Sequence, residues 1–560
     1  MTELLTAAQM RAIEEAAIAS GEVTGLELME RAGRGVVEAV FEEWPELAQA
    51  PHRAVVLCGP GNNSGDGFVV ARRLRDKGWS VEVFFYGDVE KLSADARKNH
   101  DVWASMGDIA DLTHDAVKGG LRPTLLIDAM FGTGATRALP LDLAKAHAAI
   151  ERRDVGDMHP WLKPYHRVAV DCPSGLDCDS GKVLAPELDN PNEADDVYWR
   201  YWTDEVSPRI LRTDLTCVFY RRKVGLCLNT LCGKIKVIDI GLGSEDQHPA
   251  HLLGPRPDDR AILLDFKTPS GRSRRIWPGS LLHKRASGGA NKFDHGHALV
   301  LTGGPGKTGA ARLAARGALR IGAGLVTLGV PGAAQMEVAG QVTSIMLKRA
   351  GTEEEVASVL EDTRINVLCL GPGLGLTRAR GLVEKVLSGV EPRPTVLDAD
   401  ALSAFEAVPE ALFERLHGKC VLTPHGGEFA RLFPDIAEKL NAVPTKGPAY
   451  SKVDATREAA KRAGCVVLFK GPNTVIAAPD GRCSINSAQY ERSAPWLATA
   501  GSGDVLAGFI TGLLARGFDP MQAAETAAWL HVECARAFGP GLIAEDLPEA
   551  LPGVLRELGV

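Results

Sequence analysis

Blocks of apolar and polar residues predict two successive α/β series in this chain. After an amphipathic start with Met10, Ile13 and Ala17 at helical spacing, the apolar runs RAVVLCG, SVEVFFYG, TLLIDAM and RVAVDCP follow one another. Helical stretches such as GFVVARRLRDKG separate these runs, and this alternation is typical of parallel strands covered by helices on both faces. We therefore predict a Rossmann-like, three-layer αβα domain whose last strands are LTCVFY and KIKVIDIG.

The second series begins at HALVLTGG and continues through LVTLGVP, NVLCLGPG, TVLDADAL and CVLTPHGGEF to CVVLFKGPNTVIAAP, with helical runs between these segments. Two late segments, VLAGFITGLLARG and PMQAAETAAWLHVECARAFG, carry small and apolar residues around much of their circumference, which indicates buried helices. We predict an α/β fold throughout, with domains over 1–245 and 275–560 and a linker over 246–274. Residues 186–212, acidic and then rich in Trp and Tyr, are interpreted as an inserted surface loop.

The length, net charge and cysteine content of the chain exclude several classes of protein. A chain of 560 residues is too long for one ordinary core, and its net charge of -8 gives no basic footprint for nucleic acid or an anionic membrane. The first residues lack the features of a secretory signal, and no window offers about 18 apolar residues in a row, so we expect a cytoplasmic protein. The 11 cysteines form no CxxC pair, and we interpret them, Cys172 and Cys178 included, as reduced structural thiols.

Three polar motifs follow predicted strands of the first series. GPGNNSGDG at 59–67 leads from a strand into a helix, where glycines and backbone N–H groups can hold a phosphate. DAMFGTG and DCPSGLD place Asp128, Asp171 and Ser174 at two further strand ends. A lone Asp at a strand end is usually a cap or loop residue, but the carboxyl ends of parallel strands converge on one crevice. The three motifs together therefore favour a ligand site.

These motifs resemble the epimerase domain of the NAD(P)H-hydrate repair enzymes, over roughly residues 1–245. The resemblance implies a potassium ion held by Asn63, Asp128 and Ser174, and it makes Asp171 the candidate acid/base that contacts the damaged nicotinamide ring. Arg137 is a candidate helper cation. The residues implied to bind the hydrated dinucleotide are Asn62, Asn63, Ser64, Gly65, Asp66, Gly132, Thr133, Gly134, Ala135, Thr136, Arg137, Ala138 and Asp171.

In the second series, ATAGSGDVLAGFITGLLARG places Asp504 at the start of a helix behind Gly501 and Gly503. Helix N-terminal amides stabilise anions, although an isolated Asp there is as easily a cap as a catalyst. GGPGKTG lacks the spacing of a P-loop, which disfavours an ATPase of that class. The AGSGD motif around Asp504, together with KGPNT, resembles the ribokinase-like superfamily. In that superfamily the GxGD aspartate deprotonates a hydroxyl that attacks a nucleotide phosphate. Asp504 is therefore the candidate base.

LGPGLG, LTPHGGEF and KGPNT, in this order before AGSGD, resemble the ADP-dependent NAD(P)H-hydrate dehydratase branch over roughly residues 275–560. The resemblance implies substrate contacts at Ala310, Gly373, His425 and Asp504. A nucleotide would be held by Lys470, Gly471, Pro472, Asn473, Thr474 and Gly503. ADP would be the co-substrate, leaving as AMP and phosphate, with a magnesium ion whose ligands no local carboxylate cluster identifies.

The first hypothesis is thus a bifunctional repair enzyme acting on hydrated NADH and NADPH, in which the N-terminal domain interconverts the R and S hydrates and the C-terminal domain dehydrates the S form. A second is a kinase of a vitamin precursor, such as a pyridoxal or hydroxymethylpyrimidine compound, with a regulatory N-terminal domain. A third makes the N-terminal domain a binding module without catalysis. A homo-oligomer is a family expectation only.

Overall fold

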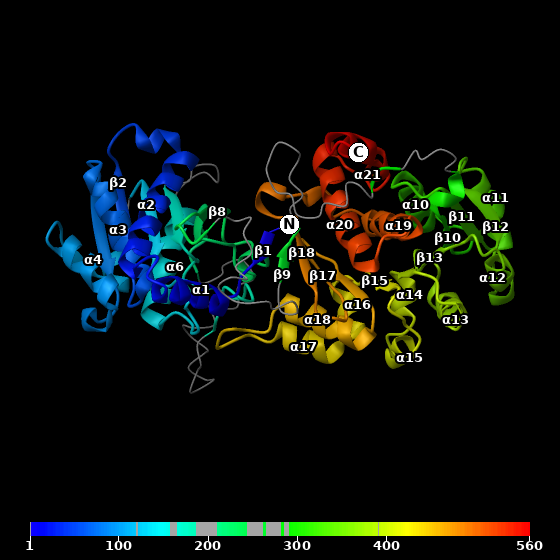
Figure 1. Ribbon diagram of the computed structural model, residues 1–560, viewed down its shortest axis with the longest axis horizontal. Coiled ribbons are helices and arrows are strands. Elements are labelled where there is room, and N and C mark those ends of the chain that lie inside the picture. Colours follow the sequence, from blue (N-terminus) through cyan, green and yellow to red (C-terminus); the bar gives the residue numbers. More distant parts are fainter. Residues whose placement is uncertain are drawn as a thin grey trace. The chain divides into compact units, whose positions relative to one another are not determined.

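The structure is a computed structural model of the chain. It describes residues 2–118, 121, 123–156, 165–185, 210–243, 261–264, 282–284, 291–389 and 391–560. The chain divides into two compact units (Figure 1). The N-terminal unit consists of Glu3–Arg256 with Ala442–Ser451. The C-terminal unit consists of Met1–Thr2, Pro257–Asn441 and Lys452–Val560.

The N-terminal unit is built on a seven-stranded, fully parallel sheet of order β4-β3-β2-β5-β6-β7-β8. The chain moves from β2 outward to β4 and then returns to β5 on the other side of β2. Ligands bind at such a switch point, outside the carboxyl ends of the strands. The strands are β2 (Arg53–Cys58), β3 (Ser80–Phe85), β4 (Ile109–Asp111), β5 (Leu125–Ala129), β6 (His166–Val170), β7 (Leu215–Phe219) and β8 (Lys234–Ile238).

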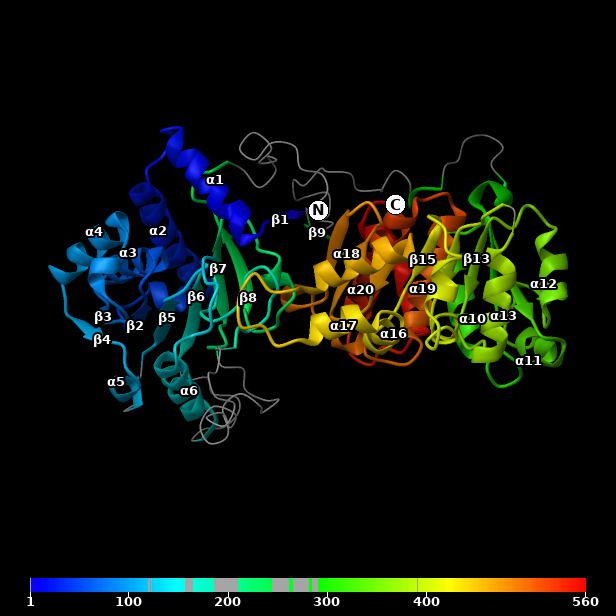
Figure 2. The same cartoon turned by 90° about the horizontal axis from the view of Figure 1, so that it is seen from below.

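Helices cover both faces of this sheet, as Figure 2 shows. One apolar core joins the sheet to α1 to α4, and a second core joins its other face to α5 and α6. Because successive strand residues point to opposite faces, Val56 lies in the first core and its neighbours Val55 and Leu57 in the second. The predicted three-layer fold is confirmed. The helices are α1 (Ala7–Ala19), α2 (Gly25–Glu43), α3 (Asn62–Asp76), α4 (Ala94–Ala104), α5 (His114–Lys118) and α6 (Leu141–Gly156).

The C-terminal unit contains most of an eleven-stranded sheet of order β1-β9-β18-β17-β16-β15-β14-β13-β10-β11-β12. From β16 to β12 all neighbours are parallel, and the switch point lies between β10 and β13. The strands are β1 (Thr2–Leu4), β9 (Ala261–Leu263), β10 (His297–Leu301), β11 (Leu325–Val330), β12 (Met346–Arg349), β13 (Val367–Leu370), β14 (Thr395–Leu397), β15 (Cys420–Leu422), β16 (Val466–Phe469), β17 (Asn473–Ala477) and β18 (Cys483–Ser487).

The segment CVVLFKGPNTVIAAP closes the second series with more than one element. The segment forms two antiparallel strands, β16 and β17, with Lys470, Gly471 and Pro472 at the turn. Gly471 has φ +151°, which side-chain-bearing residues rarely adopt, and Pro472 has no N–H to donate to a sheet, so the strand ends there. The turn places KGPNT at the end of the sheet where the ligand loops lie.

The predicted late helices are confirmed as α19 (Ser502–Ala515) and α20 (Pro520–Phe538), which are buried with α10 (Gly309–Arg320) in the largest core. A Cβ on Gly508 would lie 2.1 Å from the carbonyl oxygen of Ala314, so α10 and α19 approach this closely only because the residue is glycine. The remaining helices are α11 (Gln335–Ala339), α12 (Glu353–Leu360), α13 (Leu376–Leu387), α14 (Asp400–Ser403), α15 (Glu410–Phe413), α16 (Gly426–Leu432), α17 (Pro434–Asn441), α18 (Lys452–Ala463) and α21 (Asp546–Glu557).

Some predictions fall partly outside the described residues. Of the predicted surface insertion over 186–212, residues 186–209 lie outside them, whereas Ile210 and Leu211 at its end are buried. Most of the predicted linker also lies outside them, and β9 comes from its described part. All 11 cysteines are buried and none forms a disulfide, as expected of structural thiols. Within the part of the chain that the structure describes, no helix is both long and apolar enough to cross a membrane.

Candidate functional sites

Asp171 is the centre of the site in the N-terminal unit. It follows β6, has φ +64°, and its side chain is 10% exposed. Its Oδ2 accepts hydrogen bonds from the backbone N–H and the hydroxyl of Thr133, both at 2.7 Å. A Cβ on Gly132 would lie 2.8 Å from the same oxygen, so the loop can approach the carboxylate only with glycine there. The loop after β5 and the loop after β6, predicted to converge, are thus joined at Asp171.

Lys223 is the cation that accompanies Asp171. Its Nζ lies 3.4 Å from Asp171 Oδ1, is fully buried, and donates to the carbonyl oxygens of Phe219 and Arg221 at 3.0 and 3.1 Å. A bridge between Lys223 and Leu5 holds this stretch beside the start of α1. Arg137, the predicted helper cation, is exposed and instead forms a backbone bridge with Lys446.

Two further carboxyl groups, those of Glu14 and Asp66, lie near Asp171. Burial and then the nearby charge of Asp171 raise the pKa of Glu14 to about 7, although Lys223 lowers it. Burial, Asp171 and Glu14 together raise the pKa of Asp66 well above its ordinary value. Because its pKa is about 7, Glu14 can bind and release a proton near neutral pH.

The three residues implied to hold potassium lie around the same strand ends. Ser174 donates to Asp128 through its hydroxyl at 2.6 Å and its backbone N–H at 2.9 Å, and Asn63 donates to the carbonyl oxygen of Val170 at 3.2 Å. Burial raises the pKa of Asp128 to about 6 although the Ser174 hydrogen bonds lower it. Among the described residues no lysine or arginine pairs with Asp128, and a buried carboxylate without such a partner suits a cation ligand.

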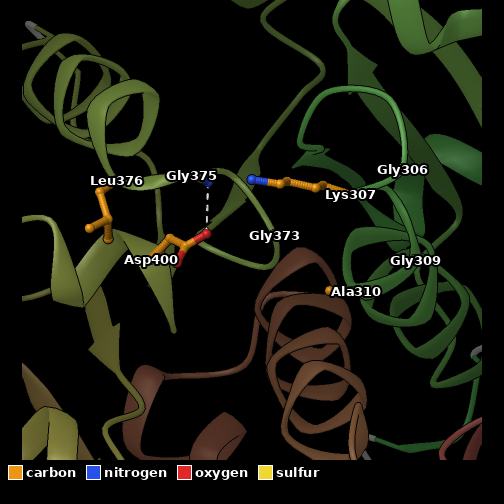
Figure 3. A pocket seen from close by; sticks show the side chains of 8 residues that line it. All are labelled: Gly306, Lys307, Gly309, Ala310, Gly373, Gly375, Leu376 and Asp400. Atoms are coloured by element: carbon orange, nitrogen blue, oxygen red, sulfur yellow. Dashed lines mark hydrogen bonds between the residues drawn. The ribbon is translucent and has the colours of Figure 1, made fainter.

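In the C-terminal unit a cavity of about 560 Å³ opens at the switch point. The loops after β10 and β13 form it, and Figure 3 shows Lys307 reaching from the first loop toward the second. Asp400 closes one side, where its Oδ2 accepts the backbone N–H of Gly375 at 2.7 Å. The cavity therefore brings together Ala310 and Gly373, two predicted substrate contacts, but His425 and Asp504 are not among its lining residues.

Lys470 lies within a group of carboxylates that no local sequence motif revealed. Its Nζ contacts Asp398 Oδ1 at 2.7 Å and Glu428 Oε2 at 3.7 Å, and Thr423 donates to the same Asp398 oxygen at 2.8 Å. Burial lowers the pKa of Lys470, but Asp398 and Glu428 outweigh it and the pKa is raised. A Cβ on Gly503 would lie 3.6 Å from this ammonium, so KGPNT and AGSGD meet at Lys470.

Asp504 lies in the first turn of α19, as predicted. Burial and the neighbouring charge of Asp398 raise its pKa to about 7, although Lys470 lowers it. A carboxylate with this pKa can accept a proton at neutral pH, which is what a general base requires. Within the described residues no three His, Cys, Asp or Glu side chains form a metal-ligand cluster.

His425 is the N-terminal cap of α16. Its Nδ1 accepts the backbone N–H of Gly427 at 3.0 Å, and Glu428 accepts the backbone N–H of His425 at 2.8 Å. The ring is 55% exposed, so it remains accessible to a ligand.

Lys452, which the sequence did not single out, holds the KGPNT turn. Its Nζ donates to the carbonyl oxygens of Lys470 and Asn473 at 3.1 and 2.8 Å. Burial lowers the pKa of Lys452 to about 7.

Comparison with known proteins follows the same division. A family model described as YjeF-related protein N-terminus matches residues 25–194, and one described as NAD(P)H-hydrate dehydratase matches residues 298–551. The bifunctional NAD(P)H-hydrate repair enzyme Nnr of Moorella thermoacetica is 34% identical over 99% of this chain and 97% of its own length. The NAD(P)H-hydrate epimerase of Rhodobacter capsulatus is 48% identical over 32% of this chain and 80% of its own length.

Among solved structures, an ADP/ATP-dependent NAD(P)H-hydrate dehydratase from Bacillus subtilis, co-crystallised with ATP and Mg²⁺, is 29% identical. It covers 51% of this chain and 100% of its own, with a TM-score of 0.41. The resemblance found in the motifs is confirmed by the relative that matches almost the whole chain. The chain belongs to the family of bifunctional NAD(P)H-hydrate repair enzymes.

Proposed function

We propose that the chain returns hydrated NADH and NADPH to the working coenzymes in two reactions, one in each unit. The N-terminal unit interconverts the R and S hydrates, and the C-terminal unit dehydrates the S form with ADP as phosphoryl donor. The observation that carries the proposal is a pair of carboxylates, one in each unit: Asp171, which follows β6 beside Lys223, and Asp504, which lies in the first turn of α19 with its pKa raised to about 7. A stereospecific dehydratase alone would leave the R hydrate unrepaired, which gives the fusion its chemical sense.

In the N-terminal unit, epimerisation requires the hydroxyl at the hydrated carbon to leave and return, or the ring to open and close. Asp171 contacts the nicotinamide ring and shuttles the proton, oriented by Thr133 and Lys223. Glu14 exchanges protons with this pair, since its pKa of about 7 allows both protonation states at neutral pH. The start of α3, from Asn62 to Asp66, and the loop from Gly132 to Ala138 hold the rest of the dinucleotide.

Potassium is proposed at Asn63, Asp128 and Ser174, where it would supply positive charge beside the bound substrate. Exchange of potassium for a bulky organic cation such as tetramethylammonium is then expected to lower epimerisation and leave dehydration unchanged. The variant Asp128→Asn, which keeps the size of the side chain but removes its charge, should lose the dependence on potassium. A variant that still responds to potassium as the parent does would remove this site assignment.

In the C-terminal unit, Asp504 takes the proton of the ring hydroxyl as that oxygen attacks the β-phosphorus of ADP. The bond from this phosphorus to the bridging oxygen breaks, and AMP leaves with the electron pair. Loss of phosphate from the ring carbon and of a proton from the adjacent carbon then restores the double bond. The ammonium of Lys470 and the first amides of α19 stabilise the phosphate charge, and magnesium bound with the nucleotide would neutralise more of it.

Ala310, Gly373 and His425 complete the proposed hydrate site, and Lys470 to Thr474 with Gly503 hold the nucleotide. The test is absorbance in the reduced nicotinamide band while the protein acts on a mixture of R and S hydrates of NADH with ADP, and separately with ATP. Complete recovery that requires ADP is the expected result. Recovery that stops at the S fraction would leave the N-terminal unit without catalysis, and no recovery with either nucleotide would favour kinase activity on another small molecule.

A further inference from the structure

The segment Ala442–Ser451 lies between α17 and α18 in the sequence, yet it packs as part of the N-terminal unit. It crosses the two loops that carry the proposed epimerase residues. The backbone N–H of Gly447 donates to the carbonyl oxygen of Thr136 at 3.0 Å, and Lys446 forms an antiparallel bridge with Arg137. Both partners belong to the loop from Gly132 to Ala138, for which substrate contact is proposed.

Two residues later the same segment reaches the other loop. The backbone N–H of Ala449 donates to Asp177 Oδ2 at 2.8 Å, and the Asp177 side chain is buried. Earlier in the segment, the carbonyl oxygen of Pro444 accepts the backbone N–H of Ala185 at 2.7 Å. Asp177 and Ala185 continue the stretch that begins with Asp171 and Ser174. The segment therefore joins the substrate loop to the loop of the catalytic carboxylate.

We infer that Ala442–Ser451 is a positioning element of the epimerase, supplied by the dehydratase half of the sequence. Thr133 already ties the first loop to Asp171, but it does so at only one end of that loop. The hydrogen bond from Gly447 fixes the loop three residues further on, at Thr136. A loop held at both points is ordered before the dinucleotide binds, so less conformational entropy is lost on binding. The inference rests on the proposed role of the Gly132 to Ala138 loop.

A consequence for the chain follows from the sequence position of the segment. Residues 1–245 contain the complete parallel sheet of the N-terminal unit but not this element. Epimerisation with the parent affinity should therefore need residues that lie about 200 positions beyond the last strand of that sheet. The two activities would then be connected through the chain itself and not only by the fusion of two independent catalysts.

The experiment uses the full chain, with residues 443–449 replaced by seven alternating glycines and serines. The interconversion of R and S hydrates is followed without ADP, and dehydration of the S hydrate with ADP is measured on the same preparation. We expect the KM for epimerisation to rise about tenfold with kcat within about threefold of the parent, since hydrogen bonds that only order a loop act on binding. Dehydration should stay within about twofold of the parent, because its residues are untouched.

Two point variants make the outcome decisive if the replaced chain does not fold. Gly447→Pro removes the one N–H that holds Thr136, and Val443→Ser changes a side chain of the same segment that is 72% exposed. Gly447→Pro should raise the KM for epimerisation and Val443→Ser should not. An unchanged KM in Gly447→Pro, or a lower melting temperature without a change in KM, would overturn the inference. A parent chain that fails to epimerise at all would instead overturn the proposed function.

Discussion

Asp171 and Asp504, the proposed catalytic carboxylates of the two units, have very different surroundings. Asp171 receives two hydrogen bonds from Thr133 and lies against the buried ammonium of Lys223. Asp504 receives no side-chain hydrogen bond from the residues that the structure describes, and the nearby Lys470 contacts Asp398 instead. The first carboxylate is fixed in orientation by donors, whereas the second is kept near its protonation midpoint at neutral pH by burial and like charge.

This difference indicates which residues orient the substrate-facing carboxylate and which exchange the proton in each proposed site. In the dehydratase site the proposed mechanism gives one residue, Asp504, the task of accepting the hydroxyl proton, and this residue also has the raised pKa that proton transfer needs. In the epimerase site these two properties are found on different residues. Asp171 is the carboxylate held in a fixed orientation, whereas Glu14 is the carboxyl group whose pKa is about 7. We therefore expect single substitutions to be more damaging in the C-terminal unit than in the N-terminal unit, where two carboxyl groups share the proton.

The largest effect is expected for Asp504→Asn. The amide cannot accept the proton of the ring hydroxyl, so kcat for dehydration should fall on the order of 10³-fold or more. Epimerisation of the same preparation, followed by the exchange of R and S hydrates without ADP, should be unchanged and serves as the control for folding. Retention of more than a tenth of the dehydration rate would mean that another group is the base.

A smaller loss is expected for Asp171→Asn. The amide keeps the volume of the side chain and one acceptor for Thr133 but no longer balances the charge of Lys223, so epimerisation should fall on the order of 10²-fold. Dehydration of pure S hydrate should continue at the parent rate. If the variant binds the hydrate normally and epimerises at full rate, Asp171 has no catalytic role.

Glu14→Gln separates the two tasks within the epimerase site. If Glu14 supplies the proton to the departing hydroxyl, parent kcat/KM for epimerisation falls as pH rises through about 7, the value to which burial raises the pKa of Glu14. The variant should be slower by about tenfold at pH 6.5 and should lack this inflection. The measurement is the rate of epimerisation from pH 5.5 to 8.5. An inflection near 7 that persists in the variant would assign the proton to Asp66 or to another group.

The sequence predicted the architecture well because both sheets are mostly parallel and their strands are short, apolar and followed by polar loops. It also identified loops that the fold brings together, since strands such as β2, β5 and β6 end at the same edge of one sheet. It did not reveal Lys223 or Asp398. Lys223 is placed beside Asp171 by its bridge to Leu5, and Asp398 meets Lys470 only because β14, β15 and β16 are neighbours. Such pairings depend on tertiary contacts between segments that share no local motif.

The smallest expected effect is on stability, and its sign follows from the pKa of Asp504. Burial raises this pKa from 3.8 to about 7, so the folded chain binds the proton more tightly than the unfolded chain does. Below about pH 4 both states are protonated and the carboxyl costs nothing. As pH rises from about 4 to about 7, the unfolded state loses its proton first and the folded state is destabilised, by at most about 4 kcal/mol above pH 7.

Asp504→Asn removes this penalty, so its gain in melting temperature over the parent should grow between pH 5.5 and pH 8 and change little beyond. The expected gain at pH 8 is at most roughly 8–16 °C, since about 1 kcal/mol corresponds to roughly 2–4 °C in a domain of this size. Glu438→Gln, at an exposed position, is the control and should give the same small shift at each pH. A gain for Asp504→Asn that is equal at pH 5.5 and pH 8 would show that its carboxyl does not titrate in this range. Asp504 would then lack the raised pKa on which its proposed role as the base depends.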